Sequence, residues 1–443
     1  MEEIRLSTYG EVSSRPSPAN RMMEDFASGF RDGVDINLGV GYVNERTIPA
    51  AEIRRALECV LDAPAKYRQA LNYGGPSGSE NLIASVRRYL LSNKVGGISE
   101  ETFAGRRIII GPNGATSLLE SIAHILPPGI VVTSDPTYYI FTNTLERLGF
   151  DILPVPEDPE GIRTDLLESK LGALGDRLDE ISFFYLVTIN NPSCAILSNR
   201  RRRELIGCAT RLSRRLGRKI PVVLDRAYED LVHDPEVGPL ESGLLSDHAG
   251  VVCEIGTLSK ILAPALRIGY LIGPEGPFMD VMVQRTFDSG FSAALICQEI
   301  ASWLLDHEIE DQLARVRAGY RQKALAVRDW VDQYLGDELE LVSGGRAGFY
   351  FYLTLRSVET GEGSPFFKCL TRTTGDEDID GPAGAMRPRV IYIPGEVCVH
   401  PRGDLAEAGR RQLRISYAFE ELEPLRRALA FMKEAIDYAR QRC

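Results

Sequence analysis

The stretch VVCEIGTLSKILAPALRIGYLIG, Val251 to Gly273, consists of two apolar runs around a short connection that carries Lys260 and Arg267. The two runs predict neighbouring sheet strands, because apolar residues without a polar face are typical of strands that are covered on both sides. Arg267 opens the second of these runs. Two cations in a segment that is expected to be buried are costly unless each is paired or neutralised. The sequence therefore predicts a compensating group for Lys260 and for Arg267.

Strands and helices alternate ahead of this stretch from about residue 106. Three intervening helices are expected at 115–126, 138–149 and 201–217. This alternation favours an α/β domain with a mostly parallel sheet. The seven expected strands are RRIIIGP (106–112), IVVTSD (130–135), DILPVP (151–156), ISFFYLVTI (181–189), IPVVLD (220–225), VVCEIG (251–256) and RIGYLIG (267–273).

The remainder of the chain predicts a smaller α+β domain. A long helical pattern covers 292–335, and a closing helix covers 423–442. The segment TTGDEDIDGPAGAM (373–386) is expected to be an exposed loop, because it is rich in Gly, Thr and acidic residues. We expect residues 1–60 to form an N-terminal arm and part of the small domain, 61–325 the large domain, and 326–443 the rest of the small domain. Strands are expected in ELELVSGG (338–345), GFYFYLTL (348–355), RVIYIPG (389–395) and RQLRISYAF (411–419).

Composition restricts the class of protein. The chain has 443 residues and a net charge of -11, which disfavours nucleic acid and anionic membrane as main partners. Its eight cysteines include no C-x-x-C pair, and its five histidines no H-E-x-x-H, so no metal site is expected. The N-terminus has no apolar signal region, and no apolar run approaches the roughly 20 residues that span a bilayer. We therefore expect a cytoplasmic protein with reduced thiols.

Polar side chains follow the expected strands where a ligand of an open α/β sheet would bind. Glycine and small residues open a helix after the first strand, which suits an anion. A lysine, a carboxylate, an amide and phenols together suit pyridoxal 5'-phosphate (PLP), which needs a Lys Schiff base and an acidic partner for its ring nitrogen. In chain order the strand-end residues are Gly114, Ala115, Thr116, Tyr138, Asn191, Asp225, Tyr228, Thr257, Ser259 and Lys260.

This order of motifs resembles the class I and II aminotransferases, the fold-type I PLP-dependent enzymes. The resemblance runs from INLGVG (36–41) to RQLRISYAFEE (411–421). SK-x-x-APALRIGY (259–270) is most similar to the kynurenine and α-aminoadipate aminotransferase branch. The resemblance implies a large domain with a mostly parallel seven-stranded sheet, a smaller α+β domain, and a homodimer. It also implies amino transfer between an α-amino acid and a 2-oxo acid.

The resemblance implies roles for five residues around the cofactor ring, of which Lys260, Asp225 and Tyr228 would be catalytic. Lys260 would form the internal aldimine and afterwards move the substrate α-proton. Asp225 would pair with the pyridinium nitrogen, and Asn191 and Tyr228 would hydrogen-bond the ring 3'-oxygen. Tyr138, two residues after Pro136, would stack on the ring.

The resemblance also implies which residues bind the phosphate and the substrate. Ala115 and Thr116 at the helix start after Gly114, Thr257 or Ser259, and Arg267 would hold the phosphate. Tyr73, in LNYGGPSGSENL (71–82), would reach the phosphate of the neighbouring subunit. Arg414 would bind the substrate carboxylate, with Gly39 and Asn191 nearby.

Two departures from the family pattern put the shape of the pocket in doubt. Cys194 stands where the family usually has a glycine after Asn191-Pro192-Ser193, which suggests a reshaped turn. Ala265 stands where glycine often precedes Leu266, which would narrow the backbone there. Neither substitution removes a catalytic group.

Two other functions share these residues. A PLP-dependent lyase or synthase, like 1-aminocyclopropane-1-carboxylate synthase or a C–S lyase, would use the same cofactor residues. A ligand-sensing regulator would carry a basic DNA-binding segment in front, and the acidic chain with a fold starting within about forty residues disfavours it. The substrate side chain is not readable, and Arg15 and Arg21 are candidates for a second carboxylate clamp.

Overall fold

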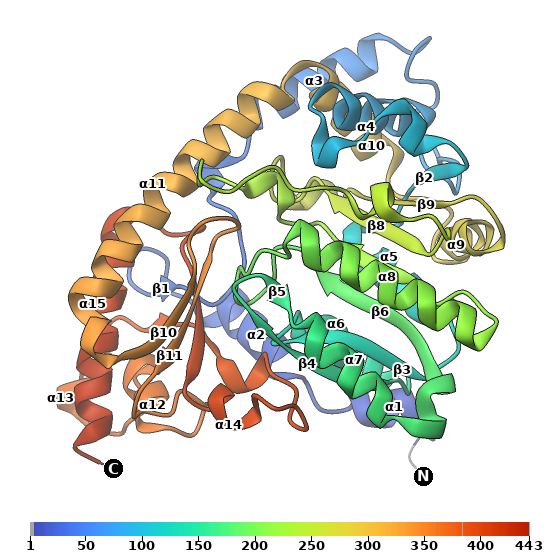
Figure 1. Ribbon diagram of the computed structural model, residues 1–443. Helices are drawn as coiled ribbons and strands as arrows, with labels where there is room; N and C mark the ends of the chain where they lie inside the picture. Colours follow the sequence, from blue (N-terminus) through green and yellow to red (C-terminus); the bar gives the residue numbers. More distant parts are fainter. Residues whose placement is uncertain (1–3, 383, 443) are drawn as a thin grey trace.

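The computed structural model describes residues 4–382 and 384–442, and a large mixed sheet forms its centre (Figure 1). The strand order is β2-β9-β8-β7-β6-β3-β4-β5. Strands β8, β7, β6, β3 and β4 are parallel, whereas β9 is antiparallel to both of its neighbours. The bounds are β2 Arg106–Ile110, β3 Ile130–Asp135, β4 Asp151–Asp158, β5 Gly161–Ile162, β6 Ile181–Val187, β7 Val222–Asp225, β8 Val252–Thr257 and β9 Gly269–Pro274.

The seven strands expected from the apolar runs are all present, and the mostly parallel sheet is confirmed. Every residue of β3, β6, β7 and β8 is buried, which explains why these strands lack an alternating polar face. The two-residue β5 adds an eighth, antiparallel edge strand that the sequence analysis did not predict.

Helices pack around this sheet in groups. Helix α5 contacts α6 and α9, and α7 contacts α8. A further group, in which α10 packs on α3 and α4, lies beyond β2 and β9 at the top of Figure 1. The bounds are α3 Ala50–Asp62, α4 Glu80–Ser92, α5 Gly114–Ile125, α6 Tyr139–Arg147, α7 Thr164–Ala173, α8 Asn199–Leu216, α9 Pro277–Asp288 and α10 Leu295–His307.

The 27-residue helix α11, Ile309–Leu335, leads into a second sheet of order β10-β11-β14-β13. The closing helix α15, Leu422–Arg440, packs on α11 and α12. Strand β1 pairs with β12, so the N-terminal segment lies beside the C-terminal strands. The bounds are β1 Ile36–Asn37, β10 Leu339–Gly344, β11 Tyr350–Leu355, α12 Pro365–Thr371, β12 Val390–Ile391, β13 Ile393–Pro394, α14 Ala406–Gly409 and β14 Gln412–Ser416.

Two local predictions in this part need correction. RVIYIPG is not one strand, because β12 pairs with β1 while β13 pairs with β14, and the chain changes sheets at Tyr392. The expected loop 373–386 contains a helical turn, α13 Glu377–Asp380. Asp380 accepts the N–H groups of Thr374 and Gly375 at 3.2 and 2.8 Å, so this segment is held by its own hydrogen bonds.

The N-terminal arm forms two helices, α1 Thr8–Ser13 and α2 Pro18–Gly29. The side chains of Ser7 and Ser17 cap them by accepting N–H bonds from Gly10 and Asn20. In Figure 1, α2 lies between the two sheets. This position brings the arm to the same region as the ends of the parallel strands.

Candidate active site

A cavity lies where the carboxyl ends of β6, β7 and β8 meet the start of α5. Ten of the predicted site residues line it, which follows from the rule that parallel strands present their carboxyl ends at one sheet edge. Gly39, Gly114, Arg414 and Tyr73 are not among its lining residues. The lining consists of Ala115, Thr116, Leu119, Tyr138, Val187, Asn191, Asp225, Ala227, Tyr228, Thr257, Ser259, Lys260, Pro264 and Arg267.

Lys260 follows β8, and its ammonium faces few compensating groups. Its Nζ donates to the carbonyl of Gly41 at 3.0 Å and lies 5.6 Å from the ring centroid of Phe349. Burial, together with the positive charges of Arg414 and Arg267, lowers the pKa of Lys260 to about 8. A minor part of the amine, larger than for an ordinary lysine, is therefore neutral near physiological pH.

Asp225 is the last residue of β7 and is buried. Its carboxylate accepts a hydrogen bond from the Tyr185 hydroxyl at 3.2 Å and one from the Ala227 N–H at 3.0 Å. Burial raises the pKa of Asp225 to about 6. No ion pair joins it to an Arg or Lys in residues 4–382 and 384–442. A buried carboxylate in this state suits a cationic ligand group, such as a protonated ring nitrogen.

Arg414 lies on β14 and is buried behind Asn191. Its Nη1 donates to Asn191 Oδ1 at 2.8 Å and its Nη2 to the Gly39 carbonyl, so the structure brings these three residues together. The guanidinium stacks on Tyr350, 4.3 Å from the ring centroid. Its buried Nε has no hydrogen-bond partner among the described residues. The protein thus orients the arginine through neutral acceptors, and in the same residues no carboxylate pairs with its charge.

The start of α5 has the features of an anion site. Asn113 makes no side-chain cap within the described residues, so its side chain leaves the N–H groups of Ala115 and Thr116 in the first turn free to meet another acceptor. Gly114 adopts φ +73°, and a Cβ there would lie 2.8 Å from Arg267 Nη2. Only glycine therefore lets Arg267 come this close to the helix start.

Arg267 differs from the sequence expectation. It is exposed, with φ +56°, in the turn before β9 rather than in a buried strand. Its guanidinium donates to Asn113 Oδ1 at 2.9 Å, to the Asn113 carbonyl at 3.0 Å and to the Pro264 carbonyl at 3.1 Å. The predicted cost of burying two cations therefore applies to Lys260 alone, because the left-handed turn carries the Arg267 side chain outward to accessible acceptors.

Hydroxyl groups complete the cavity. Thr257 donates to the carbonyl of Ile268 at 2.9 Å and accepts the N–H of Ser259 at 3.2 Å, which fixes the turn ahead of Lys260. The Tyr228 hydroxyl lies 3.1 Å from that of Tyr350. Burial raises the pKa of Tyr138 to about 12 and that of Tyr228 well above its usual range, so both phenols are neutral donors.

Tyr73 lies outside this cavity. Its side chain is 75% exposed and packs on Phe291, with ring centroids 5.2 Å apart. Leu71, two residues before Tyr73, and Phe287, four residues before Phe291, are also exposed. Within its own chain, Tyr73 contributes nothing to the cofactor cavity.

The two substitutions noted in the sequence have different outcomes. Cys194 is buried and adopts φ +51°. The cysteine therefore occupies the left-handed backbone conformation that suits glycine, and the turn keeps this conformation despite the substitution. Its N–H donates to the Asn190 carbonyl at 2.7 Å, which helps to hold the turn. Ala265 is exposed and is absent from the cavity lining, so the expected narrowing does not occur there.

Sequence reasoning missed five residues that complete the site: Gly41, Asn113, Tyr185, Phe349 and Tyr350. The aromatic strand GFYFYLTL was recognised only as a strand, because aromatic residues are typical of any buried strand and do not indicate a site. Gly41 acts through its backbone carbonyl, and a carbonyl contact leaves no residue-type signal in the sequence.

Residues 35–373 match the family described as aminotransferase class I and II. The chain belongs to this family. Its fold is that of the fold-type I PLP-dependent enzymes, as the order of its motifs implied. The comparisons favour an aminotransferase over the lyase alternative.

The aminotransferase is 28% identical over 411 residues to aromatic-amino-acid aminotransferase 1 of Thermococcus litoralis, covering 90% of this chain and 88% of that one. It is also 26% identical over 324 residues to the uncharacterized HTH-type transcriptional regulator YisV of Bacillus subtilis, which covers 72% of this chain and 61% of the regulator. The chain thus spans less than two thirds of that regulator's length.

Among solved structures, the fold is similar to kynurenine aminotransferase of Pyrococcus horikoshii, solved with PMP and kynurenine. The TM-score is 0.80 at 23% identity, and 96% of each chain is covered. Within the described residues, no helix is long and apolar enough to cross a membrane. The same part of the chain holds no cluster of three or more His, Cys, Asp or Glu side chains arranged for a metal ion.

Proposed function

We propose that the aminotransferase transfers an amino group between an α-amino acid and a 2-oxo acid, with Lys260 as the cofactor-binding and proton-carrying residue. One observation carries the assignment. A buried carboxylate that makes no ion pair within the described residues and a lysine whose pKa is lowered to about 8 line the same cavity, together with a helix start that Asn113 does not cap. These are the three groups that PLP requires of a protein.

The residues present fit PLP. Asp225 would hold the ring nitrogen in its protonated form, and Asn191 and Tyr228 would donate to the ring 3'-oxygen. Tyr138 would lie against the ring. The phosphate would meet the first turn of α5 at Gly114, Ala115 and Thr116, together with Thr257, Ser259 and Arg267. When bound, PLP withdraws electrons from the substrate α-carbon and so makes its proton acidic.

Lys260 is the group that we propose moves this proton. Its Nζ would take the proton from the substrate α-carbon and return it on the cofactor side. The lowered pKa keeps part of the amine neutral and able to accept it. The Gly41 carbonyl, 3.0 Å from Nζ, orients the amine without neutralising it by charge.

Arg414 would bind the substrate carboxylate. Asn191, Gly39 and Tyr350 hold its guanidinium in place, so little conformational entropy is lost when an anion binds. Its charge also lowers the pKa of Lys260, after the larger effect of burial. The same arginine thus supports binding and proton transfer.

We further propose a homodimer with shared sites, in which Tyr73 reaches the phosphate of its partner. Tyr73, Leu71, Phe287 and Phe291 leave exposed apolar surface that is typical of an interface. A two-fold contact would supply each site with one foreign Tyr73. The described cysteines are free, which supports a reducing compartment such as the cytoplasm.

Borohydride trapping followed by peptide mass mapping tests the cofactor assignment. The cofactor mass should appear on the peptide that contains Lys260 and be absent from Lys260→Ala. Reaction with amino donors and pyruvate or 2-oxoglutarate should yield new amino acid without free ammonia. A tag on another lysine would overturn the residue assignment, and ammonia release in step with turnover would favour elimination.

Subunit mixing tests the shared site. Tyr73→Ala and Lys260→Ala, each inactive alone, should regain part of the activity after subunit exchange. One site of the heterodimer then carries both lesions and the other neither. Lack of recovery in verified heterodimers would mean that Tyr73 acts within its own chain.

A further inference from the structure

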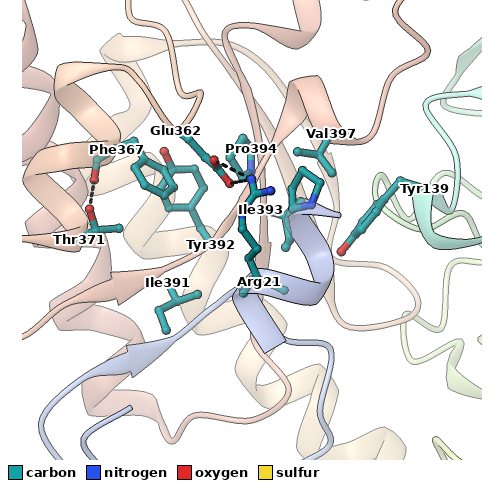
Figure 2. A pocket seen from close by; sticks show the side chains of 12 residues that line it. Arg21, Tyr139, Glu362, Phe367, Thr371, Ile391, Tyr392, Ile393, Pro394 and Val397 are labelled. Atoms are coloured by element: carbon teal, nitrogen blue, oxygen red, sulfur yellow. Dashed lines mark hydrogen bonds and ion pairs between the residues drawn. The ribbon is translucent and has the colours of Figure 1, made fainter. Parts of the chain in front are cut away.

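A second cavity lies between the arm helix α2, the start of α6 and the strands β12 and β13 (Figure 2). It collects residues from parts of the chain more than 300 positions apart. Its lining is mostly apolar and aromatic. The residues are Pro18, Arg21, Met22, Tyr139, Glu362, Phe367, Thr371, Ile391, Tyr392, Ile393, Pro394 and Val397.

This cavity adjoins the carboxylate-binding arginine. A Cβ on Gly39 would lie 2.9 Å from Ile391 Cγ2 and 3.0 Å from Met22 Sδ, both of which line the cavity. The carbonyl of the same glycine accepts from Arg414. Tyr139, on another wall, directly follows Tyr138 of the cofactor cavity. A substrate anchored at Arg414 therefore has this cavity beside it.

The only two charged residues in the lining neutralise each other. Arg21 Nη2 lies 3.0 and 3.2 Å from the two carboxylate oxygens of Glu362, and Nη1 donates to the Pro16 carbonyl at 3.0 Å. Figure 2 shows this pair between Tyr139 on one side and Phe367 and Tyr392 on the other. Both charged side chains are half exposed, so the pair stands at the solvent-facing side of the cavity. The cavity thus has no net formal charge.

We propose that this cavity receives the substrate side chain and that Glu362 restricts it to uncharged, apolar or aromatic side chains. The inference rests on the proposed function, because it needs Arg414 to hold the substrate carboxylate. Glu362 is then a specificity-determining residue. Arg21, a candidate second carboxylate clamp from the sequence, is occupied by a carboxylate of its own chain.

Charge explains the selectivity. A second substrate carboxylate would have to displace Glu362 from Arg21 and would lie beside a like charge, both of which cost free energy. An apolar or aromatic side chain instead gains by leaving water for the walls made by Met22, Tyr139 and Phe367. The pair excludes acidic side chains by repulsion, while the apolar walls favour the others.

Glu362→Gln is the deciding variant, since it removes the negative charge and keeps the size of the side chain. We would measure kcat/KM of the holoenzyme for the amino-donor half-reaction with phenylalanine, leucine and glutamate. The wild type should prefer phenylalanine or leucine over glutamate by tenfold or more. Glu362→Gln should raise the value for glutamate about tenfold and change that for leucine by less than about threefold.

Two further variants separate charge from other effects. Glu359→Gln removes a nearby exposed carboxylate that pairs with Arg410 at 2.7 Å and does not line the cavity, so it should leave the glutamate-to-leucine ratio unchanged. Arg21→Gln combined with Glu362→Gln should lose the gain for glutamate, because no cation is then freed.

The outcomes distinguish the two proposals. A wild type that prefers glutamate, or a Glu362→Gln protein with an unchanged ratio and intact leucine turnover, overturns the inference. An equal rise for glutamate in Glu359→Gln also overturns it, because a general charge effect would then explain the gain. A holoenzyme that reacts with no amino acid would refute the proposed function instead.

Discussion

Asp225 and Arg226 are neighbours in the chain and both are buried, yet their surroundings differ completely. Arg226 pairs with Glu229 and Glu254, each at 2.6 Å. Asp225 faces the cofactor cavity with two neutral hydrogen-bond donors and no ion pair in the described residues. Two adjacent residues therefore differ in how their charges are compensated. We call the ion-paired group around Arg226 the closed network, and we call Asp225, which has no ion pair in the described residues, an open charge.

The closed network extends beyond Arg226. Glu229 also pairs with Arg202 at 2.7 Å, and Glu254 accepts from the Ser242 hydroxyl and the Gly243 N–H. Although burial acts to raise it, the charges of Arg202 and Arg226 lower the pKa of Glu229 to about 2. In contrast, burial prevails at Asp225 and Lys260. We infer that charges paired within the chain, as in the closed network, stabilise the fold. Charges without such a partner, as at Asp225 and Lys260, are where a ligand would supply the partner.

The largest expected effect is at the open lysine. Lys260→Ala should reduce kcat about 10³-fold or more, because in the proposed mechanism it removes both the cofactor-binding amine and the proton carrier. Its unfolding midpoint in urea, measured on cofactor-free protein, should not fall below that of the wild type. A large loss of stability would instead mean that Lys260 stabilises the fold, as the closed network does.

The closed network should respond in the opposite way. Glu254→Gln should lower the free energy of unfolding by about 3–5 kcal/mol, since it leaves Arg226 with an incomplete set of partners in the interior. Urea denaturation of the cofactor-free protein measures this. Glu275→Gln, on an exposed carboxylate, is the matched control and should change the free energy of unfolding by less than about 0.5 kcal/mol.

Asp225→Asn should stabilise the cofactor-free protein while impairing catalysis. Burial raises the pKa of Asp225 to about 6, so the folded state favours the protonated carboxyl, and its stabilisation is lost as the pH rises from about 4 through 6. The variant should therefore match the wild type below about pH 4 and exceed it by about 3 kcal/mol near pH 8.

The two measurements for Asp225→Asn are denaturant unfolding at several pH values and turnover of the loaded enzyme. Turnover should fall about 10²-fold or more, because the asparagine cannot keep a ring nitrogen protonated by charge. A stability gain that does not depend on pH would show that Asp225 is not the titrating group.

The smallest effect is expected from Tyr73→Phe. If its hydroxyl donates to the partner's bound phosphate, losing that charge-assisted bond should weaken cofactor affinity by roughly tenfold to a hundredfold. Equilibrium dialysis or fluorescence titration of PLP measures this. An unchanged affinity for PLP would mean that the Tyr73 hydroxyl does not donate to the bound phosphate.

Local sequence signals predicted the strands of the large sheet well and those around the second sheet less well. Continuous apolar runs can be recognised from the sequence without knowledge of the strands that pair with them. Such runs form β3, β6, β7 and β8. RVIYIPG has the same character but changes sheets at Tyr392, because pairing partners are decided by packing. Arg267 was misplaced for a related reason, since a left-handed turn re-aims a side chain without altering the apolar pattern around it.

The sequence by itself determined the chemistry: a lysine, a carboxylate, an amide and an arginine in a fixed order at strand ends. Residue type and spacing suffice for this, because parallel strands bring their ends together by topology. Only the tertiary structure decided how each group is poised, through the Gly41 carbonyl at Lys260 and the absence of an ion pair at Asp225 in the described residues. It also paired Arg21 with Glu362 across 341 positions of chain. Such contacts depend on how distant elements pack, and no local pattern encodes them.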